Sequence, residues 1–132
     1  MSAPRLPGAL RCLAWLTTFD VVLRLRGLQR GLAMARRLGA SGPTLPWSAE
    51  WTDAVAHRVA VAAAFYPRRA LCLEQSLALF VALRRAGAPA VLRIGVRPVP
   101  FAAHAWVEIA GQAVNEPQDF IGQLVPFPGL GG

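Results

Sequence analysis

Cys72 and His104, two residue types that act together in nucleophilic catalysis, lie 32 positions apart in this sequence. Cys72 falls in the predicted first turn of an apolar helix, where the helix dipole favours the thiolate, the nucleophilic form of cysteine. Arg68 and Arg69 lie just upstream and add positive charge there. His104 opens a predicted strand, and an imidazole held beside a thiol can act as its general base. The pair is therefore a candidate for covalent catalysis through cysteine.

The strand predicted around His104 determines which side chains accompany it. Because side chains alternate along a strand, His104, Trp106 and Glu108 share one face. We expect this face to point toward the start of the helix that carries Cys72, and Val107 and Ile109 to point away. A cysteine at a helix start and a histidine on a strand is the arrangement of papain-like and transglutaminase-like cysteine enzymes. Taken alone, the pair leaves open a structural role in the core.

Four helices are expected to come first in the chain. Periodicity and end signals predict helices over 9–26 and 28–38, a third capped by Ser48 and ending before Pro67, and a fourth from about Ala70 to Gly87. The fourth is apolar on most sides and reads as a buried central helix. The inward residues expected on the first helix are Leu10, Leu13, Ala14, Thr17, Val21 and Leu25, and those on the third are Trp51, Val55, Val59 and Ala62.

After Gly87 the periodicity becomes that of strands. Strands are predicted over 90–96, 103–109 and 112–116, and the tail from residue 117 is expected to be irregular. Helices followed by an antiparallel meander predict an α+β fold, in which the buried central helix packs on a small antiparallel sheet. A length of 132 residues is typical of one domain.

Three segments carry a resemblance to a known family. They are C-L-E-Q-S-L-A-L-F-V-A-L-R-R-A-G over 72–87, R-I-G-V over 93–96, and F-A-A-H-A-W-V-E-I-A-G-Q-A-V-N-E over 101–116. In this order and spacing they resemble the transglutaminase-like leader peptidases of lasso-peptide biosynthesis, the lasso B proteins. The resemblance covers about residues 65–127, or half of the chain.

The resemblance implies a papain-type cysteine peptidase that removes the leader from a ribosomally made precursor peptide. Cys72 would be the nucleophile and His104 the base. The implied partners are the precursor peptide, a separate leader-recognition protein and the ATP-dependent cyclase that closes the macrolactam. The chain would be the stand-alone peptidase of a split pair, one domain over 1–132 with a basic helical part, 1–64, and a catalytic core, 65–127. A non-catalytic peptide-binding or scaffold module is the alternative.

The third catalytic residue has two candidates. The resemblance favours Glu116, twelve residues after His104, where the family usually has aspartate. If Ala110-Gly111 is a two-residue hairpin loop, however, Asn115 faces the same side as His104, whereas a three-residue loop places Glu116 there. Either side chain can hydrogen-bond the imidazole.

The excess of positive over negative charge lies entirely in the first half of the chain. The formal net charge is +7, and residues 1–69 hold ten arginines and three acids. Exposed aromatic residues are not interleaved with these arginines, which argues against nucleic-acid binding. We instead expect them to form a basic face that docks the recognition protein or an acidic leader. The residues of this basic face are Arg24, Arg26, Arg30, Arg36 and Arg37.

Several other functions are disfavoured by the sequence. No spacing of histidine and cysteine suits zinc, and no glycine-rich phosphate loop occurs, so no metal or other cofactor is expected. The longest uncharged apolar run is too short to span a bilayer, so membrane insertion is not expected. Two cysteines, Cys12 and Cys72, are too few for a disulfide framework. We therefore expect a cytoplasmic protein.

Overall fold

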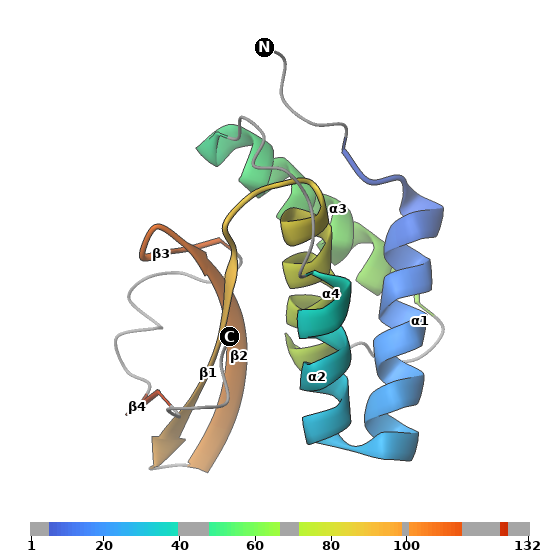
Figure 1. The fold of residues 1–132 in the computed structure, drawn as a ribbon. Coiled ribbons are helices and arrows are strands. Elements are labelled where there is room, and N and C mark those ends of the chain that lie inside the picture. The colour runs from blue at the N-terminus through green and yellow to red at the C-terminus, as the bar shows by residue number, and fades with distance from the viewer. Residues whose placement is uncertain (1–5, 40–47, 67–71, 99–100, 115–124, 127–132) are drawn as a thin grey trace.

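The computed structural model describes residues 6–39, 48–66, 72–98, 101–114 and 125–126, in which a layer of helices packs on one face of a small antiparallel sheet (Figure 1). The fold is α+β, as predicted. The helices are α1 (Ala9–Arg26), α2 (Leu28–Leu38), α3 (Ala49–Phe65) and α4 (Cys72–Arg85); the strands are β1 (Val91–Pro98), β2 (Phe101–Ile109), β3 (Gln112–Ala113) and β4 (Val125–Pro126).

The sheet has the strand order β3-β2-β1-β4, and every neighbouring pair is antiparallel. The first three strands form the predicted meander. Strand β4 lies in the tail that was expected to be irregular, and that prediction is wrong at these two residues. Their partners on β1 are Gly95 and Val96, about thirty positions earlier in the chain. A pairing this short and this distant has no local sequence signal.

Helix α4 is the central element of the core, as its composition predicts. The five consecutive residues from Leu77 to Val81 are each at most 2% exposed. Consecutive residues point in different directions around a helix, so neighbours enclose α4 on all sides. It packs against α1, α2, α3 and the first two strands. Its C-terminal end is followed by Gly87 at φ 99°, a conformation that favours glycine.

The stripe predicted to be buried on α1 is wrong, although the bounds of the helix are confirmed. Leu10 and Leu25 are 83% and 76% exposed, whereas Cys12, Leu16 and Phe19 are at most 1% exposed. Helix α1 carries apolar residues on several sides, so periodicity alone could not decide which side packs against α3 and α4.

Helix α3 follows the sequence prediction closely. The Ser48 side chain caps the helix by accepting a hydrogen bond from the Trp51 backbone N–H at 3.1 Å. All four residues expected to point inward are buried: Trp51, Val55, Val59 and Ala62.

A polar cluster joins α1 to the end of α3. The Tyr66 hydroxyl donates to Asp20 Oδ2 at 2.8 Å, and Asp20 Oδ1 lies 3.4 Å from Nε of Arg24. Asp20 is only 7% exposed, so these partners compensate a carboxylate removed from water. Burial, followed by the hydrogen bond to Asp20, raises the pKa of Tyr66 above its ordinary value of 10.0. Burial also raises the pKa of Cys12 above 9.0, an effect that the charge of Arg58 partly opposes.

These two raised pKa values predict a loss of stability in alkali. Each group ionises at a lower pH in the unfolded chain than in the fold, so their contribution is complete below the unfolded pKa and is lost as pH rises through the folded one. We expect the free energy of unfolding, measured by urea denaturation, to fall as the pH rises past the ordinary pKa values of 9.0 for Cys12 and 10.0 for Tyr66. The Tyr66→Phe variant is expected to show a shallower fall above the ordinary tyrosine pKa of 10.0. Stability that is constant or rising over this range contradicts the prediction.

Candidate active site

Cys72 is the first residue of α4, as the sequence predicts. The backbone N–H groups of a first helical turn carry partial positive charge, which favours a thiolate over a thiol at that position. The element that positions the proposed nucleophile is therefore the buried central helix, and this helix is fixed by packing on every side.

A buried hydrogen bond ties the N-terminal half of α4 to the strand that carries His104. Ser76, one turn after Cys72, is fully buried, and its hydroxyl donates to the carbonyl oxygen of Ala105 at 3.0 Å. Cys72 precedes Ser76 by four residues, which is a rise of about 6 Å along the helix axis. The start of α4 therefore lies about one helical turn from the Ser76 contact with Ala105. The structure thus brings together the two elements that the sequence singled out.

The face of β2 that packs on the helices differs from the one expected. Ala105, Val107 and Ile109 are at most 4% exposed and belong to the same core as α4, so the prediction that Val107 and Ile109 point away from the helix is wrong. By alternation, His104 lies on the opposite face with Trp106. The sequence could not settle this because both faces of the strand carry large apolar residues. The pairing of Cys72 with His104 stays a prediction.

Beside His104 the neighbouring strand has no side chain. His104 is half-buried, and its partner across the β1–β2 pair is Gly95. Opposite residues in such a pair have Cβ positions about 5 Å apart, so a side chain at 95 would adjoin the imidazole. At Gly95 the neighbouring strand therefore has no side chain that could contact the imidazole.

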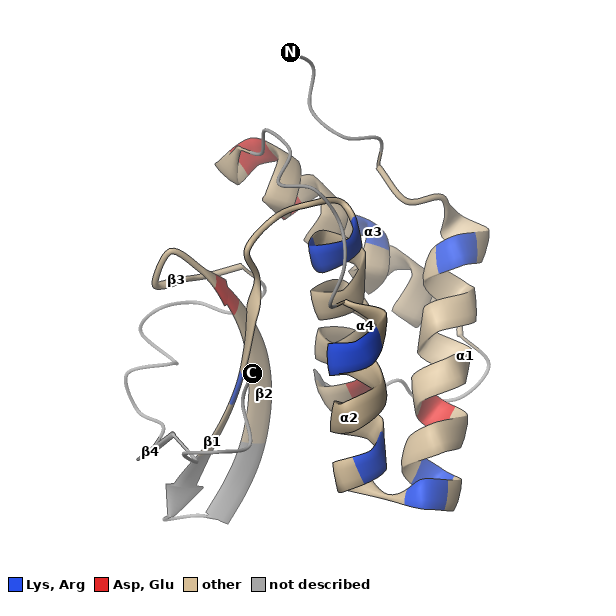
Figure 2. Cartoon of the chain, in the orientation of Figure 1, with Lys and Arg blue, Asp and Glu red and all other residues tan. Residues whose placement is uncertain are grey.

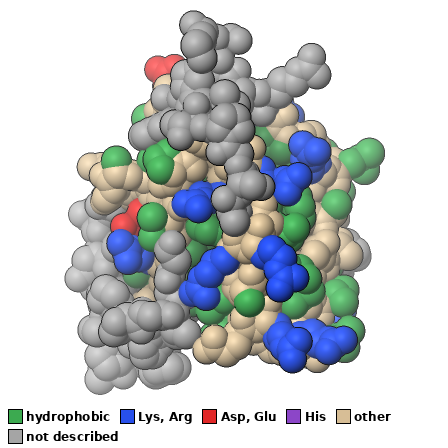
Figure 3. All heavy atoms as spheres, viewed as in Figure 1, with side chains coloured by type: hydrophobic (Ala, Val, Ile, Leu, Met, Phe, Trp, Pro, Cys, Tyr) green, Lys and Arg blue, Asp and Glu red, His purple; other side chains and the backbone are tan. Residues whose placement is uncertain are grey.

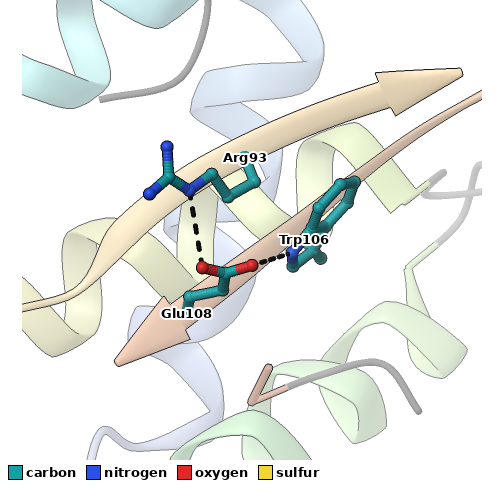
Figure 4. A network of polar contacts seen from close by, with 3 residues as sticks. All are labelled: Arg93, Trp106 and Glu108. Atoms are coloured by element: carbon teal, nitrogen blue, oxygen red, sulfur yellow. Dashed lines mark hydrogen bonds and ion pairs between the residues drawn. The ribbon is translucent and has the colours of Figure 1, made fainter. Parts of the chain in front are cut away.

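A three-residue polar network occupies the same face as His104 (Figure 4). The Trp106 indole N–H donates to Glu108 Oε2 at 2.7 Å, and Arg93 Nε lies 3.4 Å from Glu108 Oε1. Trp106 is only 1% exposed and lies on the face of β2 opposite the one that packs on the helices. Sequence reasoning placed Trp106 and Glu108 together but missed Arg93, which the strand register sets opposite Trp106.

The network predicts that substitutions of Trp106 and Arg93 lower the free energy of unfolding by different amounts. Trp106→Phe keeps an aromatic ring but removes the indole donor, leaving a largely buried carboxylate oxygen unsatisfied, so we expect it to lower the free energy of unfolding by about 1–3 kcal/mol. Arg93→Ala is the matched comparison: half of the Arg93 side chain is exposed, and we expect a cost below about 1 kcal/mol. Urea denaturation of both variants measures this, and an equal or reversed order would contradict the assignment.

The β2–β3 hairpin has the two-residue loop. Ala110 and Gly111 have φ values of 54° and 78°, as a type I′ turn requires. Glu108 pairs with Ala113, and the backbone N–H of residue 114 donates to the carbonyl of residue 107 at 2.8 Å. This is the register under which the sequence argument favours Asn115, and the three-residue alternative is wrong. Asn115 and Glu116 both lie outside the described residues, so the choice of Glu116 stays a prediction.

The remaining titratable candidates have structural explanations. Cys12 is a free thiol at 1% exposure, packed in the core as expected. His57 is exposed on α3. Within the described residues, no group of three or more potential metal ligands lies together. None of the helices in the described part of the chain combines the length and hydrophobicity needed to cross a bilayer.

Residues 13–126 match the family model described as the transglutaminase-like superfamily, and the chain belongs to that superfamily. A 45-residue stretch is 47% identical to the microcin J25-processing protein McjB of Escherichia coli. This stretch is 34% of the present chain and 22% of McjB, so the chain spans only about a fifth of that relative's length. No solved structure matches the chain.

Proposed function

We propose that this chain is a cysteine peptidase that removes the leader from a lasso-peptide precursor. Membership of the transglutaminase-like superfamily and the similarity to a microcin-processing protein support a role in lasso-peptide processing. The observation that carries the peptidase proposal is the Ser76–Ala105 hydrogen bond, which joins the helix beginning at Cys72 to the strand carrying His104.

In the proposed mechanism, the Cys72 thiolate attacks the carbonyl carbon of the scissile peptide bond. The His104 imidazolium gives its proton to the departing amine, and the leader remains bound to sulfur as a thioester. His104 then takes a proton from a water molecule, whose oxygen attacks the thioester carbon and releases the leader acid and the thiol. Asn115 or Glu116 would hold the imidazole in the required tautomer. The mechanism requires the Cys72 thiol to reach the face of β2 that carries His104.

The proposal is tested by mass spectrometry of a candidate precursor incubated with the protein, with and without the leader-recognition protein. We expect a leader acid and a core peptide whose masses sum to that of the precursor plus one water. A precursor that stays intact in both incubations would contradict the proposal.

A non-catalytic peptide-binding module is the second candidate. It is favoured by the packing of Val107 and Ile109, rather than His104, against the helices. This candidate predicts that the precursor binds without being cleaved. It also predicts that Cys72 is no more reactive toward iodoacetamide than an ordinary thiol.

The basic face provides a site for the leader-recognition protein. Its arginines are exposed on α1 and α2 (Figure 2), and Figure 3 shows arginine side chains spread over one side of the molecule with hydrophobic side chains between them. Arg24 also pairs with Asp20, so Arg26, Arg30 and Arg37, all exposed, are the better choices for reversal to glutamate.

Docking through this face predicts a dependence on salt. Exposed charges are screened beyond about 8 Å at physiological ionic strength, so the affinity for the recognition protein should fall as salt is added. Reversing Arg26, Arg30 and Arg37 should weaken binding mainly through a slower association rate. Surface plasmon resonance measures both effects. An affinity indifferent to salt, or unchanged in the triple variant, would argue against this face.

A further inference from the structure

A pocket lies at the end of the helical layer opposite the start of α4. Its volume is about 400 Å³, and its walls include Arg11, Trp15, Trp51, Ala82 and Arg85, together with the turn before α1. The C-terminal end of α4, which leads into β1, and the N-terminal end of α1 both lie toward this end of the molecule (Figure 1). Pockets of this size accept small ligands or a few side chains of a peptide rather than the flat surface of a folded domain.

The walls combine two indole rings with two guanidinium groups. Trp51 is only 6% exposed and Trp15 is half-buried, so both rings are fixed by packing. The guanidinium of Arg85 lies 5.8 Å from the centre of the Trp15 ring and donates to the carbonyl oxygen of Leu38 at 3.3 Å. Arg85 is therefore held at the pocket instead of extending freely into solvent, which lowers the entropy lost when it binds a ligand.

The charge of the pocket is positive. Among the described residues that line it are two arginines and no acid. Arg58 adds a further cation close by, since it donates to the carbonyl oxygen of Pro7, itself a lining residue, at 3.5 Å. Guanidinium groups bind carboxylates through paired hydrogen bonds, and indole rings bind aromatic or aliphatic side chains. The complementary ligand is a peptide segment in which acidic and bulky apolar residues are adjacent.

The position of the pocket relates it to the proposed nucleophile. Ala82 and Arg85 are ten and thirteen residues after Cys72 on the same helix. The rise of an α-helix makes this separation about 15–20 Å along the axis. An extended chain covers that distance with about five or six residues. The length of a peptide substrate is therefore enough to reach from the pocket to the start of α4.

We propose that this pocket is a second binding site for the peptide substrate, specific for an acidic segment that contains a bulky apolar side chain. The segment lies five or more residues from the cleaved bond. This assignment rests on the proposed function for the identity of the substrate, but the binding it predicts does not depend on cleavage. The pocket would hold the substrate on the rigid central helix and so raise its local concentration at Cys72.

Binding is measured by fluorescence anisotropy with the Cys72→Ala protein, which removes any contribution from cleavage. The probe is a fluorescein-labelled peptide in which aspartate alternates with phenylalanine, and its control has asparagine in place of aspartate. We expect the acidic peptide to bind at least about tenfold more tightly than the control. Arg11→Glu should weaken its binding about tenfold, whereas Gln29→Glu, which adds a negative charge at an exposed position of α2 outside the pocket, should change it less than about twofold.

Arg85→Gln provides a second variant, because Arg85, like Arg11, is an exposed residue that lines the pocket. We expect it also to weaken binding of the acidic peptide. In the active protein, Arg11→Glu should raise the KM for the full precursor and leave cleavage of a short peptide spanning only the scissile bond unchanged.

Three results would overturn the proposal. The first is equal affinity for the acidic and neutral peptides. The second is a Gln29→Glu effect as large as that of Arg11→Glu. The third is an Arg11→Glu variant that binds the recognition protein more weakly but binds the acidic peptide as before. That result would assign the pocket to the recognition protein instead. Absence of precursor cleavage would contradict the proposed function but leave the peptide-binding result standing.

Discussion

A Cys72→Ala variant is expected to fold normally and to release no leader from the precursor peptide. Without a thiol, no thioester can form, and loss of a nucleophile that acts as a unit with its base lowers turnover by at least about 10³-fold. Alanine is a good helix former and Cys72 begins α4, so we expect little change in the free energy of unfolding.

The matched control is the same substitution at the other cysteine. Cys12 is 1% exposed in the core, so Cys12→Ala should lower the free energy of unfolding by about 1 kcal/mol while leaving the rate of leader release unchanged. Rates are measured by mass spectrometry of the released leader, and stabilities by urea denaturation. If Cys72→Ala retains the activity of the unaltered protein, Cys72 is not the nucleophile.

Alanine substitutions at Asn115 and Glu116 are expected to have unequal effects. The third residue of a cysteine–histidine–acid or –amide triad orients the imidazole and stabilises its charged form, and its loss lowers turnover by orders of magnitude in serine enzymes. A smaller loss is expected here, because a cysteine–histidine pair can exist as thiolate and imidazolium without help. Under the observed two-residue loop, Asn115→Ala is the impaired variant and Glu116→Ala is nearly normal.

The family resemblance alone predicts the opposite order, with Glu116→Ala impaired and Glu116→Asp partly active. Turnover measured at saturating precursor therefore distinguishes Asn115, which the strand register favours, from Glu116, which the family resemblance favours. If both alanine variants retain nearly full activity, some other group holds His104.

The helices were predictable because their end signals are local. Ser48 caps α3 through its own side chain, and the change from helix to strand is marked by Gly87 at a positive φ value. The position of Cys72 at the start of α4 followed from the same local signals.

The packing of the site was less predictable because it depends on contacts between distant segments. The burial of Leu16 in place of Leu10 on α1 and the packing of Val107 against α4 are decided by which face meets the core. Neither could be predicted from periodicity, because α1 and β2 each carry apolar residues on more than one side. The ion pair of Arg93 with Glu108, fifteen positions apart in the chain, depends on the register of β1 against β2, which places Arg93 opposite Trp106.

The most direct test of the Cys72–His104 pair is affinity labelling with a leader-derived peptide that ends in a chloromethyl ketone. Tryptic digestion separates the two thiols, since Cys12 lies in the fragment 12–24 and Cys72 in the fragment 70–84. We predict one label per chain on fragment 70–84, formed much more slowly in His104→Ala and at the normal rate in His57→Ala, the matched change at an exposed histidine. Labelling of fragment 12–24, or a labelling rate in His104→Ala equal to that of the unaltered protein, would contradict the pair.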